Sequence, residues 1–154
     1  RIMEVVRETP DMVRLMTLPG VGKILAIVIA LEIGAISRFR RAGQCASYAG
    51  TTPRIHASGD KIRYGKMRSD VNRYLKWAFM EAANSICRHK GRLPHRHVAH
   101  IYARIKSRKG HGKAIGAVAR HLAEATFYML SKGEDYKEPN FKRNGLIQGN
   151  VSAK

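Results

Sequence analysis

Residues 18–36 read LPGVGKILAIVIALEIGAI, a turn with two glycines followed by a long apolar run. Apolar residues recur at helical spacing on both sides of the turn: Met12, Leu15 and Met16 before it, and Ile24, Ala26, Ile27, Ala30 and Leu31 after it. Gly20 and Gly22 can adopt the backbone conformations that a tight connection between two helices requires. The stretch therefore predicts a helical hairpin and favours a mainly α fold.

The spacing of this hairpin resembles the helix-hairpin-helix element, which grips a nucleic-acid backbone without reading its sequence. In that resemblance the backbone N–H groups of Gly20, Val21 and Gly22 meet a phosphate, and Lys23 adds a positive charge beside it. An ordinary pair of helices joined by a glycine turn would show the same pattern. The sequence pattern alone leaves both interpretations open for residues 1–40.

The rest of the chain predicts a small helical bundle over 41–136. Gly34 ends the second helix, and helical periods then cover about 41–48, residue 70 to the interruption at 90–95, about 95–107 and about 111–131. Ser69 or Asp70 would cap the long helix. The segment TTPRIHASGDKIRYGKMRS at 51–69 is rich in turn formers and cations, so we expect an irregular basic loop or a loose hairpin. We expect residues 137–154 to form a mobile tail.

The charge of the chain indicates a polyanionic partner. Lys and Arg number 29 against 11 Asp and Glu, which gives a net charge of +18 over 154 residues, while 44% of the residues are hydrophobic. Such an imbalance repels itself in a folded chain, so nucleic acid is the first expectation for the partner. A membrane surface is the second, and it would need an anchoring element.

No such element is evident in the sequence. The most apolar run, 24–36, is too short to span a bilayer, carries Glu32 in its interior and has no signal-peptide pattern. Cys45 and Cys87 are too few for a disulfide framework and lack the spacing of a zinc site. We therefore expect a cytoplasmic, nucleoid-associated protein without a membrane partner and without a metal site of its own.

Three stretches, taken in this order, resemble one family. They are LPGVGKILAIVIALEIGAISRFRRAGQCASYAGTTP at 18–53, HASGDKIRYGKMRSDVNRYLKWAFMEAA at 56–83 and YARIKSRKGHGKAIGAVARHLAEATFYML at 102–130. The family is the bacterial insertion-sequence transposases of the IS110 type, which include the related pilin-gene invertases. The resemblance is to their C-terminal transposase domain and covers about 15–136.

The resemblance implies a DNA recombinase whose active site is divided between two domains. A RuvC-like N-terminal domain holds Mg²⁺ with a cluster of acidic residues, and the C-terminal domain supplies a serine that attacks the phosphodiester. A structured guide RNA, the RuvC-like domain and a second copy of the protein on DNA are the implied partners. Because the chain starts at Arg1 inside a predicted helix, we expect a fragment that lacks the RuvC-like domain and is inactive alone.

On this resemblance the nucleophile falls on Ser58, in HASGDK. A serine hydroxyl needs a base or a metal to activate it, and an anionic phosphodiester needs cations around it. His56 could shuttle a proton. The expected phosphate-binding cations are Arg54, Lys61, Arg63, Lys66, Arg68 and Arg73. Without the resemblance, Ser58 would be read as a turn serine in a basic binding loop.

The chain departs from the family pattern where the long helix begins. Members usually carry a Lys and a Gly in an Ile-(Ser/Thr)-Lys-x-Gly-(Asn/Asp) run, and here Ser69 and Val71 replace them while Asn72 is retained. The common SSG is ASG, which leaves Ser58 as the candidate hydroxyl. These changes put the contacts at the helix entry in doubt, and they are also compatible with an inactive copy.

Three other interpretations arise from the sequence. A non-enzymatic helix-hairpin-helix module, such as a ribosomal or repair accessory protein, explains the size, the charge and LPGVG but not the HASGDK loop. The cluster Cys87, His89, His95, His97 and His100 matches no four-ligand zinc spacing and is read as a basic surface turn. Tyr74 and Trp77 could stack on bases or pack a domain interface, whereas Phe79 is expected in the core.

Overall fold

The computed structural model describes residues 7–58, 61–67, 70–89 and 97–139. Within them the chain is mainly helical, as predicted. The elements in order are α2 Pro10–Leu15, α3 Lys23–Ile33, the 3-10 turn η1 Ile36–Arg38, α4 Ala42–Tyr48, β1 Pro53–Ser58, β2 Lys61–Met67, α5 Arg73–Arg88, α6 His97–Lys109 and α7 His111–Lys132. No helix in this described part is long and apolar enough to cross a membrane.

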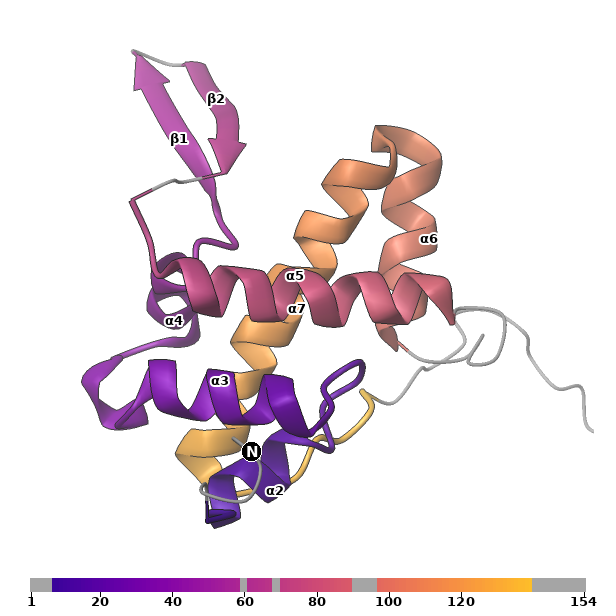
Figure 1. Cartoon of the computed structure of the whole chain (residues 1–154). Helices are drawn as coiled ribbons and strands as arrows, with labels where there is room; N and C mark the ends of the chain where they lie inside the picture. Colours follow the sequence, from indigo (N-terminus) through magenta and orange to yellow (C-terminus); the bar gives the residue numbers. More distant parts are fainter. Residues whose placement is uncertain (1–6, 59–60, 68–69, 90–96, 140–154) are drawn as a thin grey trace, which may run out of the picture.

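The central element is α7, which contacts α2, α4, α5, α6 and η1. Figure 1 shows it passing behind α5 and α3, which lie side by side across the front of the molecule. Its buried face combines large apolar residues with small ones: Ala114, Ile115, Val118, Ala119, Leu122, Ala123, Thr126 and Met129. The alanines let neighbouring helices approach closely, so the long helix becomes the common wall of a single core.

The predicted helical hairpin is confirmed as α2 and α3. Thr9 caps α2 with Pro10 in the first turn, and Gly20 makes the connection with a φ of 77°. Gly34 ends α3 with a φ of 59°. The hairpin packs so closely against α5 that a Cβ on Gly20 would lie only 2.4 Å from the carbonyl oxygen of Ala82.

The face of α3 that enters the core differs from the prediction. Ile24 and Leu31 were expected on the helical apolar stripe, but they are 62% and 65% exposed. Ala26, Ile27, Ile29 and Ile33 are buried instead. Because α3 is apolar on nearly every side, its sequence carries no strong preference for one face, and packing against α5 selects it.

The start of the long helix also differs from the prediction. Asn72, not Ser69 or Asp70, is the N-cap of α5, and its side-chain oxygen accepts a hydrogen bond of 2.9 Å from the Leu75 N–H. Asp70 is exposed and pairs instead with Arg54, at 3.7 Å. The apolar stripe that the sequence predicted for this helix is confirmed by Leu75, Ala78, Phe79, Ala82, Ala83 and Ile86, all buried.

For the segment 51–69 the sequence predicted an irregular loop or a loose hairpin, and the hairpin is the one confirmed. β1 and β2 form a two-stranded antiparallel hairpin with a register irregularity between Pro53 and Ile55. The described part of the expected tail is also held in place. Glu138 accepts a hydrogen bond of 2.9 Å from the His97 N–H, and residues 140–154 lie outside the described part.

Candidate functional site

Both ends of the β1–β2 hairpin are attached firmly to α4 and to the start of α5. The buried Thr51 donates its hydroxyl to the Ala46 carbonyl at 2.9 Å, and the Asn72 N–H donates to the Tyr48 carbonyl at 3.2 Å. Gly50, with a φ of 66°, lies so close to Val71 that a Cβ would meet the valine side chain at 2.4 Å. The base of the hairpin therefore has one defined position on the helical body.

A polar network stabilises this base. The Asn72 amide nitrogen donates to Glu32 on α3 at 2.5 Å and to the Tyr48 hydroxyl at 3.3 Å. The Arg38 guanidinium lies over the rings of Phe39 and Tyr48, at 4.7 and 4.3 Å from their centroids. The hydrogen bond from Asn72 and the adjacent Arg38 lower the pKa of the Tyr48 phenol. One amide thus ties α3, α4 and α5 together where the hairpin begins and ends.

The register of the hairpin brings the candidate nucleophile together with predicted cations. Ser58 pairs with Lys61 and His56 with Arg63, directly across the two strands. Because side-chain positions alternate along a strand, these four residues share one face of the hairpin. The intervening pairs, Ala57 with Ile62 and Ile55 with Tyr64, share the other face. Gly59 and Asp60, which join Ser58 to Lys61, lie outside the described residues.

The hairpin stands away from the helices as an arm. No helix of the described part packs along either strand, and Figure 1 shows the two strands extending beyond the bundle. Lys61, Arg63 and Lys66 are exposed, and none of them forms an ion pair with the described acids. Arg54, near the base, pairs loosely with Asp70, and Arg68 lies outside the described residues. An extended polyanion could therefore reach the cations of the arm.

The glycine turn of α2–α3 presents fewer phosphate donors than predicted. The Val21 N–H donates to the Leu18 carbonyl at 3.1 Å, and the Val21 side chain is buried. Gly20 faces the backbone of α5. Only Gly22 is open to solvent, and the Lys23 ammonium lies 2.6 Å from the Glu8 carboxylate. The close approach to α5 is thus what requires Gly20, whereas Gly22 is exposed and Lys23 is paired with Glu8.

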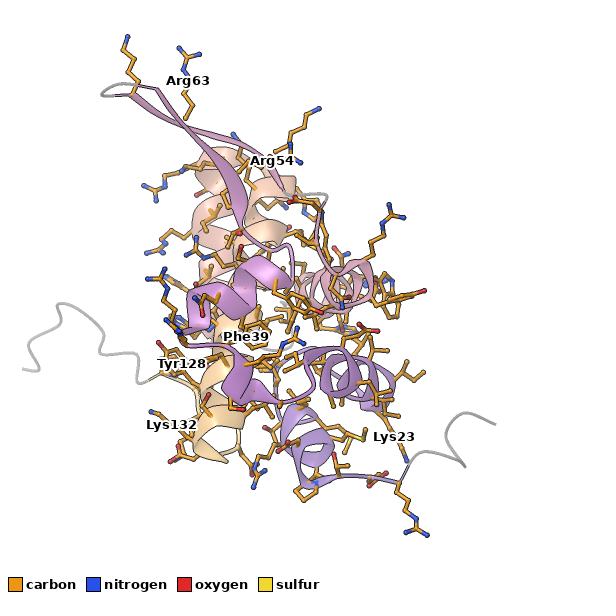
Figure 2. The ribbon with its side chains drawn as sticks, turned by 90° about the vertical axis from the view of Figure 1, so that its left-hand side faces the viewer. Lys23, Phe39, Arg54, Arg63, Tyr128 and Lys132 are labelled. Atoms are coloured by element: carbon orange, nitrogen blue, oxygen red, sulfur yellow. The ribbon has the colours of Figure 1, made fainter. Side chains whose placement is uncertain are left out.

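The two predicted binding regions are not brought together. Lys23 and Arg63 lie at opposite ends of the molecule, as Figure 2 shows. Arg73 is exposed in the first turn of α5, next to the base of the hairpin, whereas Ser58 pairs with Lys61 at the far end of the two strands. The candidate site therefore comprises Ser58, His56, Lys61 and Arg63 toward the end of the arm, with Arg73 at its base, and the glycine turn is a separate surface.

The aromatic residues of α5 and the possible metal ligands are the remaining candidates from the sequence. Phe79 is fully buried, as predicted, whereas Tyr74 and Trp77 are 68% and 49% exposed on α5. No three His, Cys, Asp or Glu side chains of the described residues come together as metal ligands, and His95 lies outside those residues.

Sequence reasoning missed the network of Glu32, Tyr48 and Asn72. A signal for part of it was present, because Asn is a preferred N-cap immediately before a helical period. The contact between Asn72 and Glu32 spans 40 positions and leaves no local trace in a single sequence.

Comparison with known proteins places the chain in a family. A sequence model of the transposase IS116/IS110/IS902 family matches residues 12–98. The transposase for insertion sequence element IS1111A of Coxiella burnetii is 27% identical over 86% of this chain. The insertion element IS110 uncharacterized 43.6 kDa protein of Streptomyces coelicolor is 32% identical over 80% of it. The chain spans only 36% and 29% of these two relatives. The family match covers more than half of the chain, which therefore belongs to the IS116/IS110/IS902 transposase family.

Proposed function

We propose that this domain binds DNA and supplies Ser58 as the nucleophile for strand cleavage and exchange in transposition. The observation that carries the proposal is the register of the β1–β2 arm, which sets Ser58 and His56 opposite Lys61 and Arg63. The arm that carries Ser58 is not packed along by any helix of the described part, which leaves room for a phosphodiester beside the paired cations.

The proposed step exchanges one phosphoester bond for another. The Ser58 oxygen bonds to phosphorus, the bond from phosphorus to one deoxyribose oxygen breaks, and the departing DNA hydroxyl takes up the proton that the serine loses. Lys61 and Arg63 offset the charge that develops on the phosphoryl oxygens. Because the ester is retained in the protein–DNA link, attack by a hydroxyl of another strand reverses the step and reseals DNA without ATP.

His56 is proposed to carry the proton between these groups. Residues two apart along one face of a strand are separated by about 7 Å at Cα. That spacing suits contact with an oxygen of a phosphate bound between the two residues better than a direct hydrogen bond to the serine. Imidazole titrates near neutral pH and can both accept and release a proton there.

The other partners come from outside this chain. The described residues hold no cluster of acids, His or Cys that fits Mg²⁺. In the proposed complete enzyme, a RuvC-like domain holds that ion, a structured RNA selects the site, and at least two copies assemble on DNA. Gly22 and Lys23 are proposed to contact a phosphate away from the cleaved bond, with Gly20 and Val21 shaping the turn.

The test is the covalent link itself. A full-length protein that carries this domain, with its RuvC-like domain, is incubated with Mg²⁺, guide RNA and labelled target DNA and then denatured. We expect a protein–DNA adduct for the unchanged protein and none for Ser58→Ala, whose affinity for DNA stays the same. Digestion and mass spectrometry should place the nucleotide on the peptide that contains residue 58.

Two results would count against the proposal. An adduct that persists in Ser58→Ala assigns the chemistry to another residue. Binding that depends on salt as expected for a polycation, but with no adduct in the unchanged protein, favours the non-enzymatic nucleic-acid-binding module instead.

A further inference from the structure

A second concentration of positive charge lies where α6 meets α7. The sequence contains no Asp or Glu between Glu81 and Glu124. Within 104–113 it places five cations: Arg104, Lys106, Arg108, Lys109 and Lys113. None of the five forms an ion pair with an acid of the described residues. We call residues 104–113 the α6–α7 tip; none of the roles proposed above uses it.

The tip is an exposed projection whose two helices are joined by a hydrogen bond. Every residue from 106 to 113 is exposed, so burial against the core cannot be the reason for its composition. Gly110 turns the chain with a φ of 83°. The Tyr102 hydroxyl and the His111 Nδ1 lie 2.8 Å apart and join α6 to the first residue of α7. The cations are therefore presented from a fixed helix–helix junction.

The placement of the charges is unfavourable for the free protein. The N-terminus of a helix carries a partial positive charge, and proteins commonly place acids there. The first turn of α7 has no acid, and it carries Lys113 with Lys109 immediately before the turn. The dipole of α6 favours Lys106, Arg108 and Lys109 in its last turn, but it does not offset their repulsion of one another and of Lys113. Cations gathered in this way, with no acid beside them, are explained by a polyanion that neutralises them when bound.

The tip and the β1–β2 hairpin that carries Ser58, called the serine arm from here on, project from the same side of the bundle. Figure 1 shows the α6–α7 junction and the β1–β2 hairpin projecting from the same side of the bundle, with α5 crossing below them. Figure 2 shows the arm at that same end, marked by Arg63, with Lys23 at the other. A duplex lying on the arm can thus extend toward the tip, whereas the α2–α3 turn is remote from both.

We propose that the α6–α7 tip is a second DNA contact, and that one duplex lies across both the tip and the serine arm. The tip binds phosphates of the DNA that flanks the cleaved site and reads no bases. It thereby sets the direction in which DNA leaves Ser58. The inference rests on the proposed function in taking duplex DNA as the ligand and the arm that carries Ser58 as its other contact.

The test uses the full chain and two matched double variants. Lys109→Gln with Lys113→Gln removes two charges from the tip and retains the length of the side-chain stems. Lys132→Gln with Lys137→Gln removes the same charge at and just after the other end of α7, where both side chains are exposed and Lys137 pairs with Glu134. Affinity for a labelled duplex of about 30 base pairs, which spans about 100 Å, is measured against salt concentration.

We expect the tip variant to lower the slope of log affinity against log salt by about two, and the control to lower it by much less. Each lost phosphate contact removes close to tenfold in affinity at about 0.1 M salt, so the two together cost roughly 10- to 100-fold. The loss should decrease as the duplex is shortened, because a duplex too short to span both surfaces cannot contact the tip while it lies on the arm. The thermal midpoint of the tip variant should be unchanged or slightly higher.

Several results would overturn the inference. Equal slopes for the tip and control variants would show that only net charge matters. An equal loss on short and long duplexes would exclude a duplex shared between tip and arm. A loss confined to duplex RNA of the same sequence would exclude DNA as the ligand.

The serine chemistry is tested separately, so the two proposals can fail separately. At saturating DNA, a full-length protein with the tip substitutions should still form the covalent adduct, and Ser58→Ala should keep the unchanged salt slope. An adduct lost at saturating DNA would mean that the tip takes part in the reaction itself and would overturn a role limited to binding.

Discussion

Replacing Gly20 with alanine should destabilise the fold strongly, although the sequence marks this glycine as a nucleic-acid contact. Its φ of 77° is a conformation that costs an L-residue with a Cβ about 1–2 kcal/mol. The added Cβ would also lie 2.4 Å from the Ala82 carbonyl oxygen and 3.1 Å from a carbon of the Ile86 side chain. Carbon and oxygen at 2.4 Å overlap, and the nearer atom belongs to the backbone of a helix, so α5 must move.

Forced overpacking of this kind typically costs about 1–3 kcal/mol. Added to the conformational cost, it predicts a loss of about 2–5 kcal/mol in the free energy of unfolding. For a protein of this size the loss corresponds to a fall of roughly 4–20 °C in the midpoint of thermal unfolding. That is a large share of the ~5–15 kcal/mol by which a typical domain is stable.

Gly22→Ala is the matched control, two residues away in the same turn. Its φ of −95° is accessible to alanine, and nothing lies within 4 Å of the position of its Cβ. We expect its stability to stay within about 0.5 kcal/mol of the unchanged protein, because a less favoured N-cap is offset by a less flexible unfolded chain. Urea unfolding of the two variants side by side is the assay. Equal midpoints would refute the packing argument for Gly20.

Two further predictions concern the base of the hairpin and the core. Asn72→Asp keeps the cap of α5 but sets a carboxylate against Glu32 in place of an amide donor, so we expect a loss of about 1–3 kcal/mol at pH 7. The difference from the unchanged protein should shrink toward pH 4, where the two carboxyls can share a proton; a difference independent of pH would contradict the contact. Burial raises the pKa of the Cys45 thiol to about 11, so the unfolded chain releases this proton first and stability should fall between about pH 9 and pH 11, by on the order of 1–2 kcal/mol. Unfolding of Cys45→Ala over the same range isolates this contribution, and an identical fall in that variant would assign it to other groups.

The local elements could be predicted because their signals are local. Helical periods marked α2, α4, α5, α6 and α7 within a few residues of their observed bounds, and Gly34 ends α3 with a positive φ as expected. The stripe of α5 was readable since polar residues occupy its other side, and Phe79 is buried as that stripe requires. Where polar and apolar residues fall on opposite sides of a helix, the sequence predicts both the helix and the face that is buried.

The sequence predicted the β1–β2 hairpin only as one of two alternatives, the other being an irregular loop. Its strands alternate cations with apolar residues, but glycines and other turn formers in the same segment outweighed that pattern. Once Ser58 and Lys61 are paired, the position of His56 opposite Arg63 follows from the period of two residues. The resemblance to a family made Ser58 the candidate nucleophile, and only the register showed which residues share its face of the hairpin.

By itself, the sequence determined the helical class, the positions of the helices, the excess of positive charge and the family of this chain. These properties depend on short-range periodicity, on composition and on the order of motifs, all of which exist before folding. Only the tertiary structure decided which side of α3 is buried, why Gly20 is required, and that the glycine turn and the serine arm lie at opposite ends. It also decided that the α6–α7 tip projects on the side of the arm. The physical reason is that such relations arise from packing between residues far apart in the chain, such as Glu32 with Asn72 and Gly20 with Ala82, and no local interaction encodes them.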